Sequence, residues 1–150
     1  MDLLILDTAK ACNTPQEFEL LSPGTGDGIG VFITVIGKDS DKGQELSDDH
    51  LDDVLRKNHK SSMRSKPGAV STAAKIRKDD IDYNAALVTG WRSVDKETKR
   101  DISTIQLGKE KLVFSLANAK KLFTALPWTC EQTGEKIYDI ASFMRNSKKA

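Results

Sequence analysis

Several residue types on which small enzymes and metal proteins depend are scarce in this sequence. Among 150 residues there are two cysteines and two histidines, and no apolar run approaches the roughly 20 residues of a transmembrane helix. Cys12 and Cys130 lie far apart and stand in no metal-binding or redox spacing, which predicts two reduced thiols. The formal net charge of +1 gives no global attraction to nucleic acid or to a membrane. The first residues are too few and too acidic for a secretory signal peptide.

Motifs for small ligands are also incomplete. Gly24 and Gly26 lack the third glycine and the following helix of a dinucleotide fingerprint. Residues 39–43 lack the Asp or Asn at position 43 and the glycine at position 44 that a calcium loop requires. His50 and His59 are too far apart for a helical metal pair. Because no nucleophile–base pair or clustered carboxylates can be proposed either, we expect a non-enzymatic protein without cofactor or metal.

What the sequence does contain predicts an α+β fold in a single domain, residues 1–150. Residues 1–45 form its β-rich part. The segments 18–21 and 30–36 are expected to be strands of an antiparallel hairpin, and the glycine-rich stretch between them is its turn. The apolar run 3–6 is expected to be a short strand or a packed terminal arm.

A short helix is predicted over residues 46–60. Ser47 is its expected N-cap, and acidic residues follow in the first turn, where the helix dipole favours them. Leu51, Val54 and Leu55 give this helix a thin apolar stripe.

Residues 61–78 are predicted to be a basic, flexible connector. The wider segment 56–78 contains eight lysines and arginines and no acidic residue. We interpret it as a solvated stretch that balances the acidic run 39–53. The alternative is a nucleic-acid-binding patch, although no aromatic residue is interleaved for base stacking.

Residues 79–146 are predicted to be mainly helical. Three aspartates charge the start of a central helix that ends at Trp91, with one apolar face formed by Ile81, Ala85, Val88 and Trp91. Residues 93–110 are expected to be a long polar loop, with a short extended piece at 102–107.

The C-terminal part predicts a helical hairpin. Ser115 is a good N-cap, and the first helix presents Leu116, Ala119, Phe123 and Leu126 on one face. Pro127 cannot continue that helix but suits the first position of the next. The apolar face of the second helix is expected to consist of Thr133, Ile137, Ile140, Ala141 and Met144. The expected architecture is thus a small N-terminal antiparallel β-hairpin or sheet, followed by a mainly helical bundle that ends in this hairpin.

The order of these signals resembles one protein family. A Pro/Gly turn precedes the strand 30–37, and a helix expected to end at Trp91 is followed by a variable polar loop. The C-terminal pieces are Phe114-Ser115 with Asn118-Ala119, then Leu126-Pro127-Trp128, Gln132 and Ile140-Ala141-Ser142-Phe143-Met144. Over residues 17–146 the chain resembles the tail assembly chaperones of bacteriophages with long non-contractile tails.

The resemblance implies a late morphogenetic protein of the host cytoplasm that is absent from the mature virion. It would bind the tape-measure protein and help to recruit tail-tube subunits, without nucleic acid or membrane, and self-association is compatible with this role. The candidate partner-binding residues follow a groove beside the C-terminal hairpin: Trp91, Leu122, Phe123, Leu126 and Trp128. The alternative for each of them is a place in the core.

Two other functions and one further expectation accompany this hypothesis. The chain could instead be a small DNA-associated regulatory protein that uses residues 56–78, or a structural tail or connector component. In the resembled family a longer product often arises by ribosomal frameshifting. Residues 147–150 could be encoded by a slippery A-rich run, so we expect a minority product that extends past Lys149.

Overall fold

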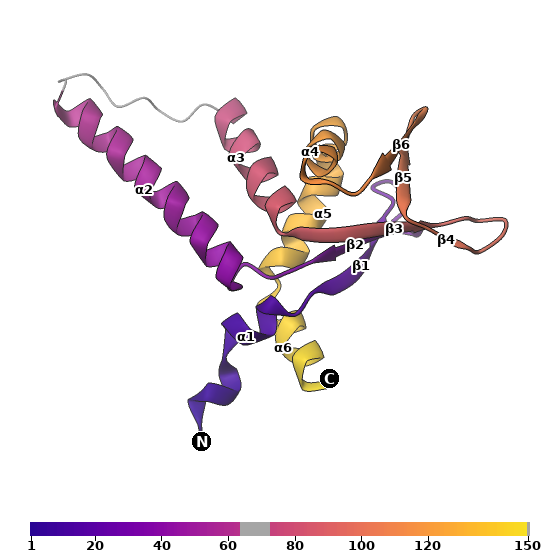
Figure 1. Cartoon of the computed structure of the whole chain (residues 1–150), viewed down its shortest axis with the longest axis horizontal. Coiled ribbons are helices and arrows are strands. Elements are labelled where there is room, and N and C mark those ends of the chain that lie inside the picture. Colours follow the sequence, from indigo (N-terminus) through magenta and orange to yellow (C-terminus); the bar gives the residue numbers. More distant parts are fainter. Residues whose placement is uncertain (64–72, 150) are drawn as a thin grey trace.

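The computed structural model describes residues 1–63 and 73–149 and has an α+β architecture, as the sequence predicted (Figure 1). No helix in these two ranges is long and apolar enough to cross a membrane. In chain order the elements are η1 (Leu3–Leu6), α1 (Thr8–Asn13), β1 (Gln16–Leu21), β2 (Gly28–Val35), α2 (Asp41–Met63), α3 (Ala73–Ala86), β3 (Val88–Val94), β4 (Asp101–Ile102), β5 (Thr104–Leu107), β6 (Glu110–Val113), α4 (Leu116–Ala125), α5 (Pro127–Tyr138) and α6 (Ile140–Lys149).

An antiparallel sheet with the strand order β1-β2-β3-β4 forms the N-terminal layer. The predicted hairpin of β1 and β2 is confirmed, with Phe18 opposite Ile33. The free edge of β1 is held by a side chain, because the Gln132 amide donates to the Leu21 carbonyl at 2.8 Å and accepts from its N–H at 2.9 Å. This pairing attaches α5 to the edge of the sheet.

The helix predicted to end at Trp91 is present as α3 but ends at Ala86, so its predicted C-terminal end is wrong, because Trp91 lies in strand β3. The register between β2 and β3 shifts so that Gly90 faces Thr34 while Val88 faces Val35, which leaves Thr89 as an extra residue. Such a bulge turns Val88 and Trp91 toward the same buried side. Their three-residue spacing imitates one face of a helix, although the β-branched and aromatic side chains here favour a strand.

Other boundaries around the sheet also differ from the predictions. The helix expected over 46–60 begins at Asp41, where the Gly43 N–H donates to the buried Ser40 hydroxyl at 3.1 Å, so Ser47 is not its cap. In the loop expected over 93–110, the predicted extended piece at 102–107 is confirmed by the end of β4 and by β5, while the start of β6 was not predicted. The predicted mainly helical part therefore includes four strands among its described residues. Leu3–Leu6 is neither a strand nor packed, because its one-turn 3₁₀ helix is exposed.

The predicted connector 61–78 lies partly outside the described residues. Its first residues continue α2 to Met63, residues 64–72 are not described, and its last residues belong to α3, which starts at Ala73. The aspartates expected at a helix start therefore lie in the middle of α3.

The C-terminal helices follow the sequence closely. The Ser115 hydroxyl accepts from the Asn118 N–H at 3.1 Å, and Pro127 occupies the first turn of α5. The predicted second helix is interrupted at Asp139, whose carboxylate caps α6 by accepting from the Ser142 N–H at 3.1 Å. The break turns Phe143, which the predicted apolar face omitted, into the core.

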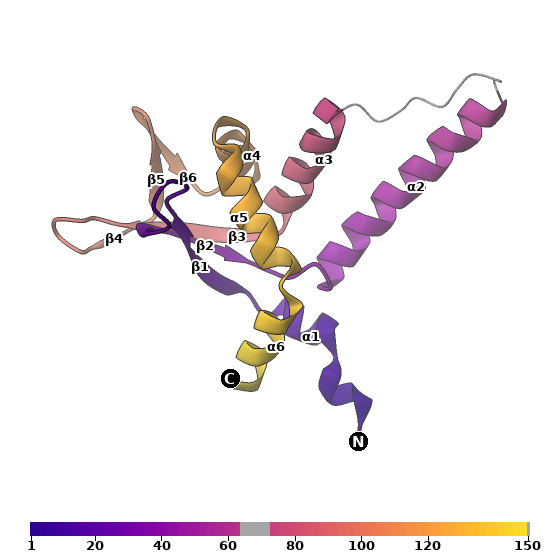
Figure 2. The same ribbon diagram turned by 180° about the vertical axis from the view of Figure 1, so that it is seen from behind.

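The helix α5 is the centre of the molecule. It contacts β1 and β2 of the sheet on one side, and α3 and α4 on others, while α6 packs against α1 (Figure 2). The backbone of α5 is also bonded to the segment that follows β2, because the Lys38 N–H donates to the Ile137 carbonyl at 3.0 Å. Consequently the surface between α3 and the α4–α5 hairpin lies on a helix that is packed against the sheet.

Candidate partner-binding groove

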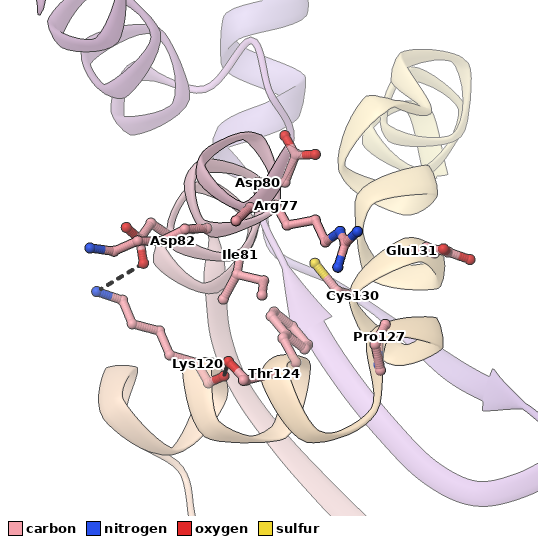
Figure 3. A pocket seen from close by; sticks show the side chains of 12 residues that line it. Arg77, Asp80, Ile81, Asp82, Lys120, Thr124, Pro127, Cys130 and Glu131 are labelled. Atoms are coloured by element: carbon pink, nitrogen blue, oxygen red, sulfur yellow. Dashed lines mark hydrogen bonds and ion pairs between the residues drawn. The ribbon is translucent and has the colours of Figure 1, made fainter. Parts of the chain in front are cut away.

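A groove with a volume of about 770 Å³ runs between α3 and the α4–α5 hairpin (Figure 3). Its apolar part consists of Ile81 from α3, Phe123 from α4, and Pro127 and Cys130 from α5. The remaining lining residues are polar or small: Ala74, Arg77, Lys78, Asp80, Asp82, Lys120, Thr124 and Glu131. Apolar surface framed by charges of both signs is typical of a site that binds an amphipathic segment.

The depth of the groove follows from the sharp turn between α4 and α5. Leu126 ends one helix and precedes the other, because its N–H donates to the Leu122 carbonyl while its own carbonyl accepts from Thr129 at 2.9 Å. Pro127 can begin a helix without a free N–H. The turn places the end of α4 beside the start of α5 and brings Phe123 under the opening, where it is fully buried.

The opposite wall is fixed by contacts between α3 and α5. Asn84 is buried and its amide donates to the Cys130 carbonyl at 3.3 Å. Gly134 makes the close approach possible, because a Cβ atom at this position would lie 3.0 Å from the Asn84 amide nitrogen. A glycine at position 134 therefore allows α5 to pack closely against Asn84 of α3.

Charges lie at the rim of the groove. Lys120 Nζ and Asp82 Oδ1 are 3.4 Å apart and join α4 to α3 at one end (Figure 3). No hydrogen bond or ion pair within the described residues engages Arg77, whose exposed side chain reaches from α3 toward Cys130. Burial raises the pKa of the Cys130 thiol above its usual value, so the thiol contributes to the apolar surface in its neutral form.

The structure separates the five residues predicted to bind a partner. Phe123 lines the groove, but Leu122 is buried beside it and does not. Leu126 and Trp128 are partly buried against the core and also lie outside the lining. Trp91 is buried, with its indole N–H donating to the Leu112 carbonyl at 3.2 Å and its ring edge-on to Phe114. In this structure Trp91 and Leu122 therefore fill the core.

Reasoning from the sequence missed the α3 wall of the groove. Ile81 was assigned to an apolar helix face, and Arg77 to a connector without a fold. Pro127 was noted only as the start of a helix. A periodicity can identify an apolar face, but it does not tell which part of that face a neighbouring helix leaves uncovered.

No protein-family model, curated protein or solved structure matches this chain. Among residues 1–63 and 73–149 no group of three or more His, Cys, Asp or Glu side chains is arranged to hold a metal ion. The groove can form apolar contacts and charged hydrogen bonds, which are the interactions that binding sites use to hold a ligand or partner.

Proposed function

We propose that this protein is a tail assembly chaperone of a long-tailed bacteriophage, which binds the tape-measure protein and helps to recruit tail-tube subunits. It would act in the host cytoplasm and leave before the virion matures. The observation that carries the proposal is the groove between α3 and the α4–α5 hairpin, beside the helices that hold the C-terminal motifs of the resemblance.

The physical argument starts from the client. A long helical protein exposes an apolar stripe along its length before it is packed, and such surface aggregates unless it is covered. An amphipathic helix can place its apolar side chains in a groove while its charged flanks meet the rim. Ile81 and Pro127 supply accessible apolar surface above the buried Phe123, and Arg77 and Glu131 supply charges of both signs.

One part of the resemblance does not support the proposal. The family pattern was matched to a helix ending at Trp91, whereas this chain has the strand β3 there. Support therefore comes from the groove and from the C-terminal order of Ser115, Pro127 and Gln132, whose local roles are structural here.

The direct test is co-expression with the product of the long, helix-rich reading frame expected downstream of this gene. Thr124 is exposed on the groove, so Thr124→Arg introduces a bulky charge there without disturbing the core. The matched control is Thr98→Arg, at an exposed turn residue between β3 and β4.

Wild-type protein and the control should keep the tape-measure protein soluble and co-purify with it, whereas Thr124→Arg should lose most of the bound client. Equal recovery with Thr124→Arg, its circular dichroism remaining native, would overturn the groove as the client site. Loss of DNA binding with rising salt, in the absence of client binding, would favour the DNA-associated alternative. Detection of the protein in purified virions would favour the structural one.

A further inference from the structure

We propose that the groove of one molecule receives the N-terminal arm, residues 1–7, of a second copy of this chain. The arm is an acidic-flanked aliphatic segment, Met1-Asp2-Leu3-Leu4-Ile5-Leu6-Asp7. This head-to-tail contact goes beyond the proposed function, because it needs no client and can be measured on the purified protein alone.

The arm presents a large apolar surface to solvent for a segment of its length. The four consecutive aliphatic side chains of η1 are exposed, and Leu4 keeps 78% of its surface accessible. The short helix is held only locally, by the Asp2 carboxylate accepting from the Leu4 N–H at 3.0 Å and by the Asp7 N–H donating to the Leu4 carbonyl at 3.2 Å. A contiguous aliphatic run of this kind is typical of a segment that binds another surface.

The groove complements the arm in charge as well as in apolar character. Asp2 and Asp7 flank the aliphatic run, and each uses one carboxylate oxygen to accept from a backbone N–H. Arg77 and Lys78 line the groove on the α3 side, and no ion pair within the described residues engages Arg77. A guanidinium can bind a carboxylate through two parallel hydrogen bonds.

Acidic residues also line the groove and do not oppose this contact at its centre. Lys120 neutralises Asp82 by their ion pair. Asp80 and Glu131 point toward the outer edges, while Arg77 reaches over the apolar part (Figure 3). An arm carboxylate placed at Arg77 therefore meets a positive charge, and the leucines meet Ile81 and Pro127.

The position of the arm makes the contact intermolecular. It extends from α1 on the side of the molecule away from the tops of α3 and α4 (Figures 1 and 2). The helix α1 is itself anchored, because it packs against α6 and the Cys12 carbonyl accepts from the Gly37 N–H at 2.9 Å. We therefore infer that the arm enters the groove of another copy and not that of its own chain. A contact between two different surfaces propagates into open chains unless it closes into a ring.

The first experiment is sedimentation velocity of the full chain over a wide concentration range. The wild-type average mass should rise with concentration, either without a plateau as open chains form, or up to a closed ring, of which a dimer with two reciprocal arm contacts is the smallest. The double variant Leu4→Asp with Ile5→Asp should associate at least about tenfold more weakly, because charged side chains are costly in an apolar groove. Leu51→Asp, at an exposed leucine of α2, is the matched control and should associate like the wild type.

The second experiment mixes two defective proteins. The arm variant keeps an intact groove, and Thr124→Arg keeps an intact arm, so each should be monomeric alone. An equimolar mixture should form one-to-one dimers and nothing larger, because only one productive contact remains. A monomeric wild type, an arm variant that still associates, or a mixture that stays monomeric would each overturn the arm-to-groove contact. None of these outcomes depends on binding of the tape-measure protein. A failure of the proposed function would appear in the co-expression test and not in these association measurements.

Discussion

The helices α2 and α5 show how differently two amphipathic segments of one chain can be used. α2 has 23 residues and projects from the body of the protein, whereas α5 has 12 and lies at its centre (Figure 1). Four residues of α5 are buried: Thr129, Cys130, Thr133 and Ile137. Among the α2 residues whose burial is described, Gly43 alone is buried, and the leucines of the stripe face solvent.

The difference teaches that partners, and not length or periodicity, decide what a helix contributes to stability. The sheet, α3 and α4 surround α5, so its apolar atoms leave water on folding. The start of α2 is anchored by polar bonds, including the Asp41 N–H to the Asn13 side-chain oxygen at 2.9 Å. Beyond that anchor its apolar stripe is not covered at Leu51 or Leu55. We therefore expect α2 to open locally at a much lower free energy than α5.

The largest expected contrast comes from truncating one aliphatic side chain in each helix. Ile137→Ala in α5 removes methyl groups that are fully buried, and should lower the free energy of unfolding by about 2–5 kcal/mol. Leu51→Ala in α2, at a leucine that is 56% exposed, should change it by less than about 0.5 kcal/mol. Urea unfolding followed by circular dichroism measures both. Similar losses in the two variants would remove the distinction between the helices.

A second contrast compares a substitution in α5, whose effect is set by packing, with one in α2, whose effect is set by helix propensity. Gly134→Val in α5 should destabilise by about 1–3 kcal/mol, because a side chain must fit against Asn84 in a filled space. Asp52→Ala in exposed α2 should stabilise by a few tenths of a kcal/mol, since alanine is the better helix former. Thermal denaturation of the two variants shows whether each substitution raises or lowers the stability. A stabilising Gly134→Val would mean that α3 and α5 are not in close contact in solution.

The edge of the sheet provides a third, smaller contrast. Gln132→Ala removes both hydrogen bonds between α5 and Leu21, and should cost about 1 kcal/mol. Gln44→Ala in α2 removes one bond from the exposed amide to the Asp39 carbonyl, and should cost no more than about half of that. The midpoints of urea unfolding measure the loss of stability in both variants. Hydrogen exchange of β1 should rise only in Gln132→Ala, and unchanged exchange there would contradict the attachment of α5 to this edge.

The smallest effect concerns pH and belongs to the packed body. The hydrogen bond from the Arg92 guanidinium holds the pKa of the Glu17 carboxyl below its usual value. This pair therefore adds stability above the ordinary carboxyl pKa, and the contribution is lost as pH falls through the lowered folded-state pKa. Because the pair is partly exposed, the effect is modest.

The measurement is stability against pH for the wild type and Arg92→Met. The variant should be less stable at neutral pH, and the difference should shrink in acid to the part that comes from Arg92 lying over the Phe32 ring, 4.1 Å from its centroid. A difference that stays constant down to strongly acidic pH would exclude the ion pair as its cause.

The predictability of the fold from the sequence also differs between regions. Ser115 and Pro127 predicted the starts of α4 and α5 correctly, because capping and the missing proline N–H act within one turn. Trp91 was misassigned because the bulge that sets its direction depends on pairing with β2, more than fifty residues earlier. The groove was only partly predictable: Phe123 came from helical periodicity, whereas Ile81 and Arg77 belong to it through the packing of α3 on the hairpin.

The central claim is that the groove between α3 and the α4–α5 hairpin is the protein-binding surface. Amide hydrogen exchange of the full chain, with and without overlapping peptides of the tape-measure protein proposed as its client, tests it most directly. We predict that a binding peptide slows exchange in residues 73–82 and 120–131, and leaves β1 and β2 unchanged. Protection confined to α2, or no protection with any peptide, would contradict the claim.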